Sequence, residues 1–185
     1  GIEYKGKVSI DNPLPKSQDV GVYFNLTYTK SQSDTLFDFD ASEWRESTDG
    51  KVDTGDIAPL KIHVGINIPL FEKLNLNIRG RYIDERTPFL ANALRDSTKK
   101  SYFPAYFVGD LALSYRSGIM SLNFQALNFT NTDYNHPGMQ TGAGGDGWEM
   151  NPDGTMNTQV RSQSYLSSMI PQALANYMVS LKLDI

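Results

Sequence analysis

The sequence predicts an all-β fold, an antiparallel transmembrane β-barrel segment, from three observations. Seven segments of the 185-residue chain alternate between apolar and polar residues. Because side chains of a strand point to opposite faces with period two, each segment has one apolar and one polar face. The connections between the segments alternate between short and longer ones, and the apolar positions hold no Asp, Glu, Lys or Arg. This pattern is typical of strands that cross a membrane with one face in lipid.

The first four strands are expected at Ile2 to Ile10, Val20 to about Lys30, Leu60 to Ile68 and Leu74 to Ile83. In each of them Ile, Val, Leu, Phe or Tyr occupies most alternate positions, with mainly polar residues between. Two prolines and the Asn12-Pro13 step predict a turn between the first two strands, because a central strand needs the N–H that proline lacks. Residues 31–59 are expected to form one long polar loop, and residues 69–73 a short turn.

The last three strands are expected at Tyr106 to Arg116, Ile119 to about Asn128 and Ala173 to Ile185. Leu, Phe, Val and Tyr again alternate with Ser, Asn, Lys and Asp. Ser117-Gly118 predicts the tightest turn of the chain. Residues 84–105 are expected as a medium loop and residues 129–172, rich in Gly, Asn, Asp and Ser, as the longest loop.

Composition narrows the classes of function. The chain has no cysteine, which excludes disulfides and thiolate metal sites. Its net charge of −4 is uneven, because residues 31–58 hold eight acids against two bases and the remainder is therefore basic. No basic patch with interleaved aromatic residues suggests a nucleic-acid partner. The sequence opens directly in a strand pattern, without a start methionine or an apolar leader, so we expect it to be part of a longer polypeptide.

Four residues are the candidate ligand-binding groups. Trp44 and Trp148 lie in expected loops, where exposed indole rings often meet ligands, although loop packing is the alternative role. Arg79 and Arg81 lie on the polar side of the fourth strand. With Lys61 and Arg116 they are suited to guide an anionic ligand, and the alternative is cross-strand pairing with Asp110 or Glu3.

The sequence favours neither an enzyme nor a metal protein. His63 and His136 are the only histidines, they share no metal-ligand spacing, and no Ser or Asp forms a triad-like pattern with them. The acidic loop from Asp34 to Asp56 offers oxygen ligands for Ca²⁺ but lacks the regular D-x-D-x-D-G spacing. We therefore predict no catalytic residue, no metal ligand and no cofactor.

Six short motifs then carry a resemblance to the C-terminal part of a TonB-dependent outer-membrane receptor. They are residues 1–3, 56–63, 76–82, 108–116, 126–134 and 170–172, in the family's order. The resemblance covers essentially all 185 residues. The chain departs from the family pattern in having Ala173 to Asn176 where Gly-Arg usually precedes the last strand, and in ending on Ile185 instead of Phe.

The resemblance implies that residues 1–185 are the C-terminal portion of a 22-stranded barrel in the outer membrane of a Gram-negative bacterium. It implies a plug domain and a TonB box outside this chain, lipid and the TonB complex as partners, and uptake of a scarce small-molecule or oligomeric ligand such as a siderophore, haem, cobalamin, a glycan or a peptide. Two alternatives remain at this point. One is an outer-membrane barrel without TonB, such as a passive channel or adhesin, and the other is a soluble antiparallel β-sandwich or binding module.

Overall fold

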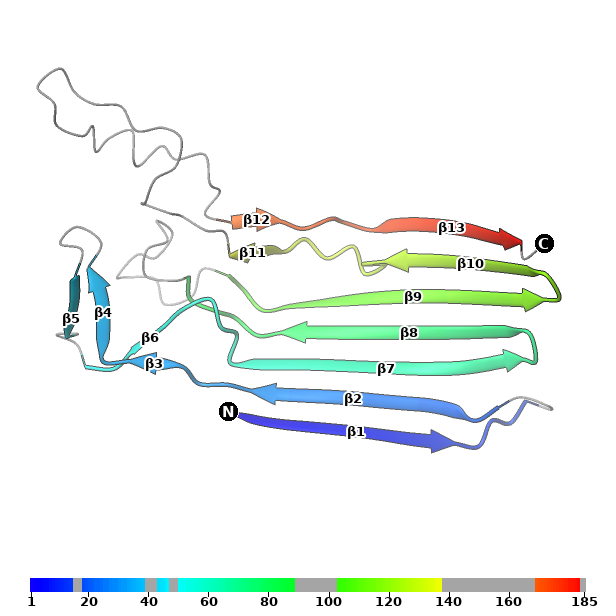
Figure 1. Cartoon of the computed structure of the whole chain (residues 1–185), viewed down its shortest axis with the longest axis horizontal. Coiled ribbons are helices and arrows are strands. Elements are labelled where there is room, and N and C mark those ends of the chain that lie inside the picture. The colour runs from blue at the N-terminus through cyan, green and yellow to red at the C-terminus, as the bar shows by residue number, and fades with distance from the viewer. Residues whose placement is uncertain (15–17, 39–42, 47–49, 89–102, 138–168, 184–185) are drawn as a thin grey trace, which may run out of the picture.

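Seven long strands form one antiparallel sheet. The computed structural model describes residues 1–14, 18–38, 43–46, 50–88, 103–137 and 169–183. In order across the sheet the strands are β1 (Ile2–Ile10), β2 (Val20–Tyr28), β7 (Leu60–Phe71), β8 (Leu74–Ile83), β9 (Tyr106–Ser117), β10 (Met120–Leu127) and β13 (Asn176–Leu183) (Figure 1). The described residues contain no helix, so the all-β antiparallel prediction is confirmed. The sheet is open, with β1 and β13 at its two edges.

β1 and β8 have the expected bounds, and the other five long strands differ from the expected ones by one to three residues at one or both ends. β7 continues to Phe71, because Pro69 and Phe71 still pair with Asn75 and Leu74 of β8 across a register shift. The tight turn is Gly118-Ile119, one residue later than expected, with Gly118 at φ 56°. Glycine at the first central position is what a type II′ hairpin turn requires. β13 begins only at Asn176, since Ala175 N donates to Asn131 Oδ1 at 3.2 Å outside the ladder.

Short hairpins lie within the two segments that were expected to be plain loops. These pairs are β3 (Gln32–Ser33) with β6 (Val52–Asp53), β4 (Thr35–Asp38) with β5 (Glu43–Glu46), and β11 (Asn135–Pro137) with β12 (Met169–Pro171). The loop prediction was therefore wrong for these residues, because runs of two to four residues are too short to show a period. All three pairs lie beyond the same end of the large sheet, which we call the loop end (Figure 1). The opposite end, with the short connections, is the turn end.

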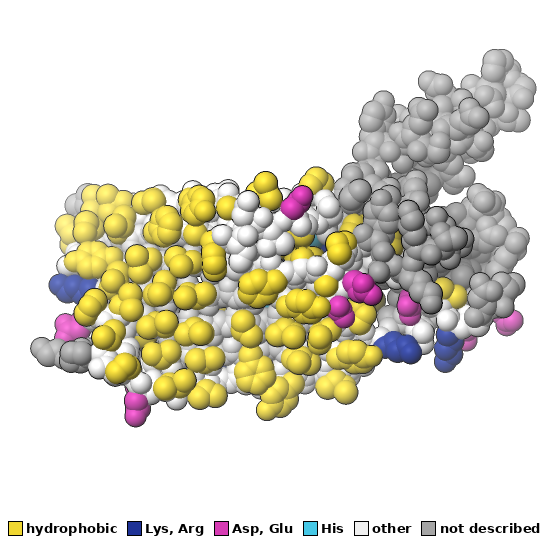
Figure 2. Space-filling model, turned by 180° about the vertical axis from the view of Figure 1, so that it is seen from behind, with side chains coloured by type: hydrophobic (Ala, Val, Ile, Leu, Met, Phe, Trp, Pro, Cys, Tyr) yellow, Lys and Arg dark blue, Asp and Glu magenta, His cyan; other side chains and the backbone are white. Residues whose placement is uncertain are grey.

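The register places residues of one kind on one face. Across β1, β2, β7, β8 and β9, one row reads Tyr4, Leu26, Ile62, Tyr82 and Phe107. Residues directly paired between antiparallel strands share a face, so the apolar positions of all seven long strands form one continuous apolar face. Figure 2 shows this face as a broad hydrophobic surface, with charged side chains near its ends. The other side of the sheet is the polar face.

The apolar face is not covered by a second layer in the described part of the chain (Figure 2). Val64 is 42% exposed and Ile66 38% exposed although both lie on a central strand. The buried apolar residues of the described chain are few, namely Ala58, Ile83, Phe103, Val108 and Ala126. A sheet with this much apolar surface in water would lose about 25 cal/mol for every Å² left unburied. A contiguous exposed apolar face of this kind marks a surface that meets another apolar phase.

Aromatic rings lie over glycines on both faces and hold neighbouring strands close. On the polar face, the ring of Tyr23 lies over Gly65, directly opposite in the register. On the apolar face, a Cβ at Gly80 would be 2.8 Å from Phe107 Cζ. Glycine at these positions leaves the space that each ring fills, which is a recognised way to support a glycine within a strand.

Asn128 is a buried polar hub where the connection leaves β10. It is 4% exposed and adopts a left-handed conformation with φ 49°. Its backbone N donates to Asp110 Oδ1 at 2.9 Å, and its Nδ2 donates to the carbonyls of Thr132 at 2.9 Å and Ala173 at 3.1 Å. Its Oδ1 accepts from Thr132 N at 3.0 Å and from Thr130 Oγ1 at 3.1 Å. Asn128 thus joins β9, the end of β10 and the segment that leads into β13.

Candidate functional site

The four predicted ligand-binding residues do not come together in the described structure. Arg79 and Arg81 lie on the polar face of β8, as expected from the alternation. Trp44 lies on β5, opposite Phe37, and its side chain is outside the described residues. Trp148 also lies outside the described residues. The structure therefore bears on the two arginines and leaves the two tryptophans as sequence predictions.

The polar face of the large sheet is strongly basic. Its strands carry seven cationic residues, Lys5, Lys7, Lys61, Arg79, Arg81, Arg116 and Lys182, against two carboxylates, Glu3 and Asp110. The whole chain is acidic, with a net charge of −4. The strand alternation thus separates charge by face, and the polar face attracts anions.

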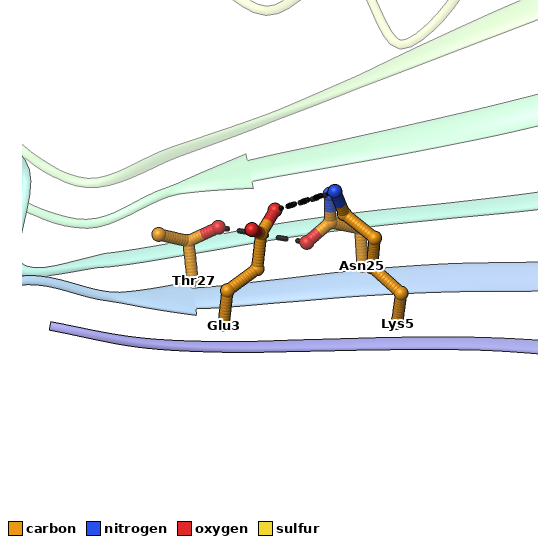
Figure 3. Close-up of polar contacts among 4 residues, drawn as sticks. All are labelled: Glu3, Lys5, Asn25 and Thr27. Carbon is orange, nitrogen blue, oxygen red and sulfur yellow. Dashed lines mark hydrogen bonds and ion pairs between the residues drawn. The ribbon is translucent and has the colours of Figure 1, made fainter.

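The two carboxylates of this face do not neutralise its arginines. Glu3 Oε1 accepts from Lys5 Nζ at 3.0 Å and from Asn25 Nδ2 at 3.4 Å (Figure 3). Asp110 lies opposite Arg79 in the register, yet the described residues show no ion pair between them, and Asp110 Oδ1 accepts the backbone N of Asn128. Of the expected cross-strand pairs, Arg79 does lie opposite Asp110, but the described residues show no ion pair of Arg79 or Arg81 with Asp110 or Glu3. Asp110 instead accepts a hydrogen bond from the backbone N of Asn128, and Glu3 forms an ion pair with Lys5.

Five side chains gather on the polar face at the loop end, and we call them the Arg–Tyr cluster: Arg81, Arg86, Tyr106, Tyr134 and His136. Arg81 Nη2 donates to Tyr134 Oη at 3.3 Å. The Tyr134 ring stacks on the Tyr106 ring, with centroids 4.3 Å apart and planes at 27°. Tyr106 Oη lies 3.3 Å from His136 Nε2. The cluster thus links β8, β9 and the segment that runs into β11.

Arg86 enters the cluster from the segment that follows β8. Its Nη2 donates to the carbonyl of Asn135 at 3.3 Å, and its guanidinium lies 5.7 Å from the centre of the Phe103 ring. Phe103 is 3% exposed and pairs with Arg86 through an isolated β-bridge. A cation over a ring face gains electrostatic stabilisation and keeps a planar guanidinium in a fixed orientation.

Positive charge dominates around the imidazole of the cluster. Burial, followed by the charges of Arg86 and Arg81, lowers the pKa of His136 below its ordinary value of 6.5. His136 is therefore neutral at pH 7, and its ring takes part in the cluster as a hydrogen-bonding group. His63 lies directly opposite Arg81 on β7. Both histidines of the chain therefore lie near Arg81, which their positions in the sequence do not indicate.

The sequence interpretation missed three members of the cluster. Arg86 and Tyr106 had no role assigned, and Tyr134 appeared only within a family-like motif. The strand register indicates that Arg81 and Tyr106 are close, because the pairs Arg81–Val108 and Ile83–Tyr106 are neighbours on the same face of the sheet. Tyr134 had no such signal, since its position depends on how the chain turns at Asn128.

The cluster is suited to binding, since it offers several N–H and O–H donors. Among the residues that the structure describes, no three His, Cys, Asp or Glu side chains are placed to hold a metal ion. Part of the acidic loop from Asp34 to Asp56 lies outside the described residues. No helix in the described segments is long and apolar enough to span a membrane. Comparisons with protein-family models, curated proteins and solved structures find no match to this chain.

Proposed function

We propose that this chain forms seven adjacent wall strands of an outer-membrane transport barrel, a TonB-dependent receptor that takes up a scarce ligand. The observation that carries the proposal is the continuous, charge-free apolar face opposite a basic, water-compatible face. In a membrane barrel the first face meets lipid and the second lines the interior. The strands contain 8 to 12 residues, close to the roughly 9–11 that a tilted strand needs to cross the bilayer.

The open edges support a larger wall. β1 and β13 each have a long-strand partner on one side only. An unpaired edge in the hydrocarbon region leaves backbone N–H and C=O groups without partners, at several kcal/mol each. In the proposed barrel, further strands of the same protein pair with both edges. The uneven connections support the orientation, because outer-membrane barrels place short turns on the periplasmic side and long loops outside.

The motif resemblance supports the TonB-dependent class over a passive channel. Two of the family-like motifs, residues 108–116 and 126–134, are also in contact, because the backbone N of Asn128 donates to Asp110 Oδ1. A receptor of this class binds its ligand from outside and spends energy delivered through TonB to the plug, and neither the plug nor the TonB box belongs to residues 1–185. No catalytic role is proposed.

Growth and uptake assays test the class. Cells that express the full-length protein should lose growth on its ligand when either the receptor gene or tonB is deleted, and should still bind the ligand at the surface without TonB. A passive channel would continue to take up its ligand in the tonB deletion. An adhesin would support no uptake in either strain, and a protein recovered only in the soluble fraction would contradict the membrane assignment.

A further inference from the structure

We propose that the Arg–Tyr cluster binds an oxyanion, the carboxylate or phosphate group of the ligand that the barrel takes up. The inference deepens the proposed function and rests on it, because it requires the polar face to line an aqueous path. It concerns a site at the loop end of the sheet, the end beside β11 and β12 in Figure 1. The site is formed by Arg81 and Arg86 with the phenol groups beside them.

The first support is the number of unused donors. A guanidinium has five N–H groups, and Arg81 uses one of them, at 3.3 Å, for Tyr134 Oη. Its Nε is shielded from solvent and has no hydrogen-bond partner in the described structure. Among the described residues Arg86 donates to the neutral carbonyl of Asn135 and hydrogen-bonds the Tyr106 side chain, and neither guanidinium is paired with a carboxylate. Shielded donors are normally paired, so the unpartnered Nε of Arg81 shows that the described residues leave this guanidinium short of an acceptor.

The second support is that three described carboxylates, Asp110, Glu3 and Asp84, have hydrogen-bond partners outside the cluster. Asp110 is held by Asn128 N, and Glu3 is held by Lys5 and Asn25. Asp84 accepts from Tyr82 Oη at 3.2 Å and from Glu85 N at 3.0 Å. The charge that acts on His136 comes from Arg86 and Arg81, which both lower its pKa. The local field is therefore positive, which favours an incoming anion.

The third support is a firm base under the donors. Val108 is 2% exposed and Ile83 7% exposed, and they lie on the polar face directly beside Arg81 and Tyr106 in the register. Stacking of Tyr106 on Tyr134 fixes the phenol that contacts Arg81. Donors held in place before binding cost less entropy when a ligand arrives, so the site is preorganised.

The chemistry of the donors selects the ligand class. Planar guanidinium groups bind carboxylate and phosphate groups through two parallel N–H···O bonds, and such charge-assisted bonds are about twice as strong as neutral ones. The cluster contains no carboxylate of its own to coordinate a cation. A neutral sugar would leave the positive charge of both arginines uncompensated.

Equilibrium binding to the full-length protein in detergent tests the inference, with radiolabelled inorganic phosphate and citrate as separate probes. Arg81→Gln and Arg86→Gln should each weaken binding of the preferred probe by roughly tenfold to a hundredfold, which is the effect of losing a hydrogen bond to a charged group. Arg116→Gln is the matched control, because Arg116 lies on the same face at the turn end. Its effect should stay below about threefold if only screened long-range charge is lost. Which probe binds tells phosphate from carboxylate.

Three outcomes would overturn the oxyanion site. They are no binding of either probe by the wild-type protein, equal losses for Arg116→Gln and the cluster variants, and equal binding of radiolabelled glucose. Each variant must first show the wild-type mobility shift on heating, so that a folding defect is not mistaken for lost binding. Cell fractionation and the TonB dependence of uptake test the receptor proposal separately. If the protein were soluble and still bound the oxyanion, the binding site would be supported and the receptor proposal would be wrong.

Discussion

Replacing Ile66 with arginine is expected to lower the free energy of unfolding in the membrane by about 2–4 kcal/mol. Ile66 lies near the middle of β7 on the apolar face, between Val22 and Ile78 of the neighbouring strands. An arginine on the lipid face costs about 2–4 kcal/mol at the bilayer midplane. This corresponds to a ratio of folded to unfolded protein that is roughly 30-fold to 1000-fold smaller than in the wild type. Urea unfolding of the full-length protein in lipid vesicles measures the loss.

Asn67→Arg is the matched control for Ile66→Arg. Asn67 is the next residue of β7 and lies on the polar face, opposite Gly21 and Asn77. The added charge and size are the same, and only the face differs. Asn67 is half-buried and accepts a hydrogen bond from Asn75 Nδ2 at 2.9 Å, so we expect Asn67→Arg to cost about the value of that bond, roughly 1 kcal/mol. Equal losses in the two variants would show that the apolar face does not meet lipid.

Replacing Asn128 with alanine is expected to destabilise the loop end by roughly 3 kcal/mol, because three part-buried hydrogen bonds of its side chain amide to the backbone are lost at once. Thr132 N and the carbonyls of Thr132 and Ala173 would each lack the bond that Asn128 now makes. The change in unfolding free energy in urea measures the effect. Limited proteolysis should also cut residues 129–134 sooner than in the wild type.

Asn131→Ala controls for backbone strain. Asn131 has nearly the same left-handed φ, 52° against 49°, but is exposed, and its side chain makes one hydrogen bond, to Ala175 N. Any cost of placing alanine in this conformation appears in both variants, and the loss of the buried network appears only in Asn128→Ala. If the two substitutions cost the same, the hub contributes little beyond its backbone conformation.

The sheet could be predicted from the sequence because its determinants are local. Alternation along one strand sets the two faces, so the positions of Phe24, Val64 and Arg81 follow from their neighbours in the chain. The ends of the strands could not be predicted where contacts between residues far apart in the sequence determine them. β7 is longer because Phe71 pairs with Leu74 of β8 beyond a register shift, and β13 begins late because Ala175 N donates to Asn131 Oδ1.

The candidate site could be predicted only in part. Arg79 and Arg81 share a face and a residue type, and the sequence does not distinguish them. The structure does, because Tyr134 contacts Arg81, and Tyr134 reaches it only after the chain has turned at Asn128. Long-range folding of a connection leaves no periodic pattern, which is why Arg86, Tyr106 and Tyr134 were missed. Trp44 and Trp148 remain predictions.

The two faces of the sheet connect the fold to the proposed function. In the described part of the chain the apolar face lacks the covering layer that a soluble sandwich has in water, and the polar face carries an excess of cationic side chains. A wall with lipid on one side and an anion-attracting aqueous path on the other accounts for both observations. The central claim is therefore about which medium each face meets.

Cysteine labelling of adjacent residues on β7 tests this claim most directly. This chain has no cysteine, so Val64→Cys and His63→Cys each introduce one thiol, on the apolar and polar face respectively. Both native side chains are exposed, so burial does not separate them. In the full-length protein, with any other cysteine replaced, the account predicts that Val64→Cys reacts with a lipid-soluble maleimide and is protected from a water-soluble one, while His63→Cys reacts with the water-soluble reagent. Equal labelling of both thiols by the water-soluble maleimide would contradict it.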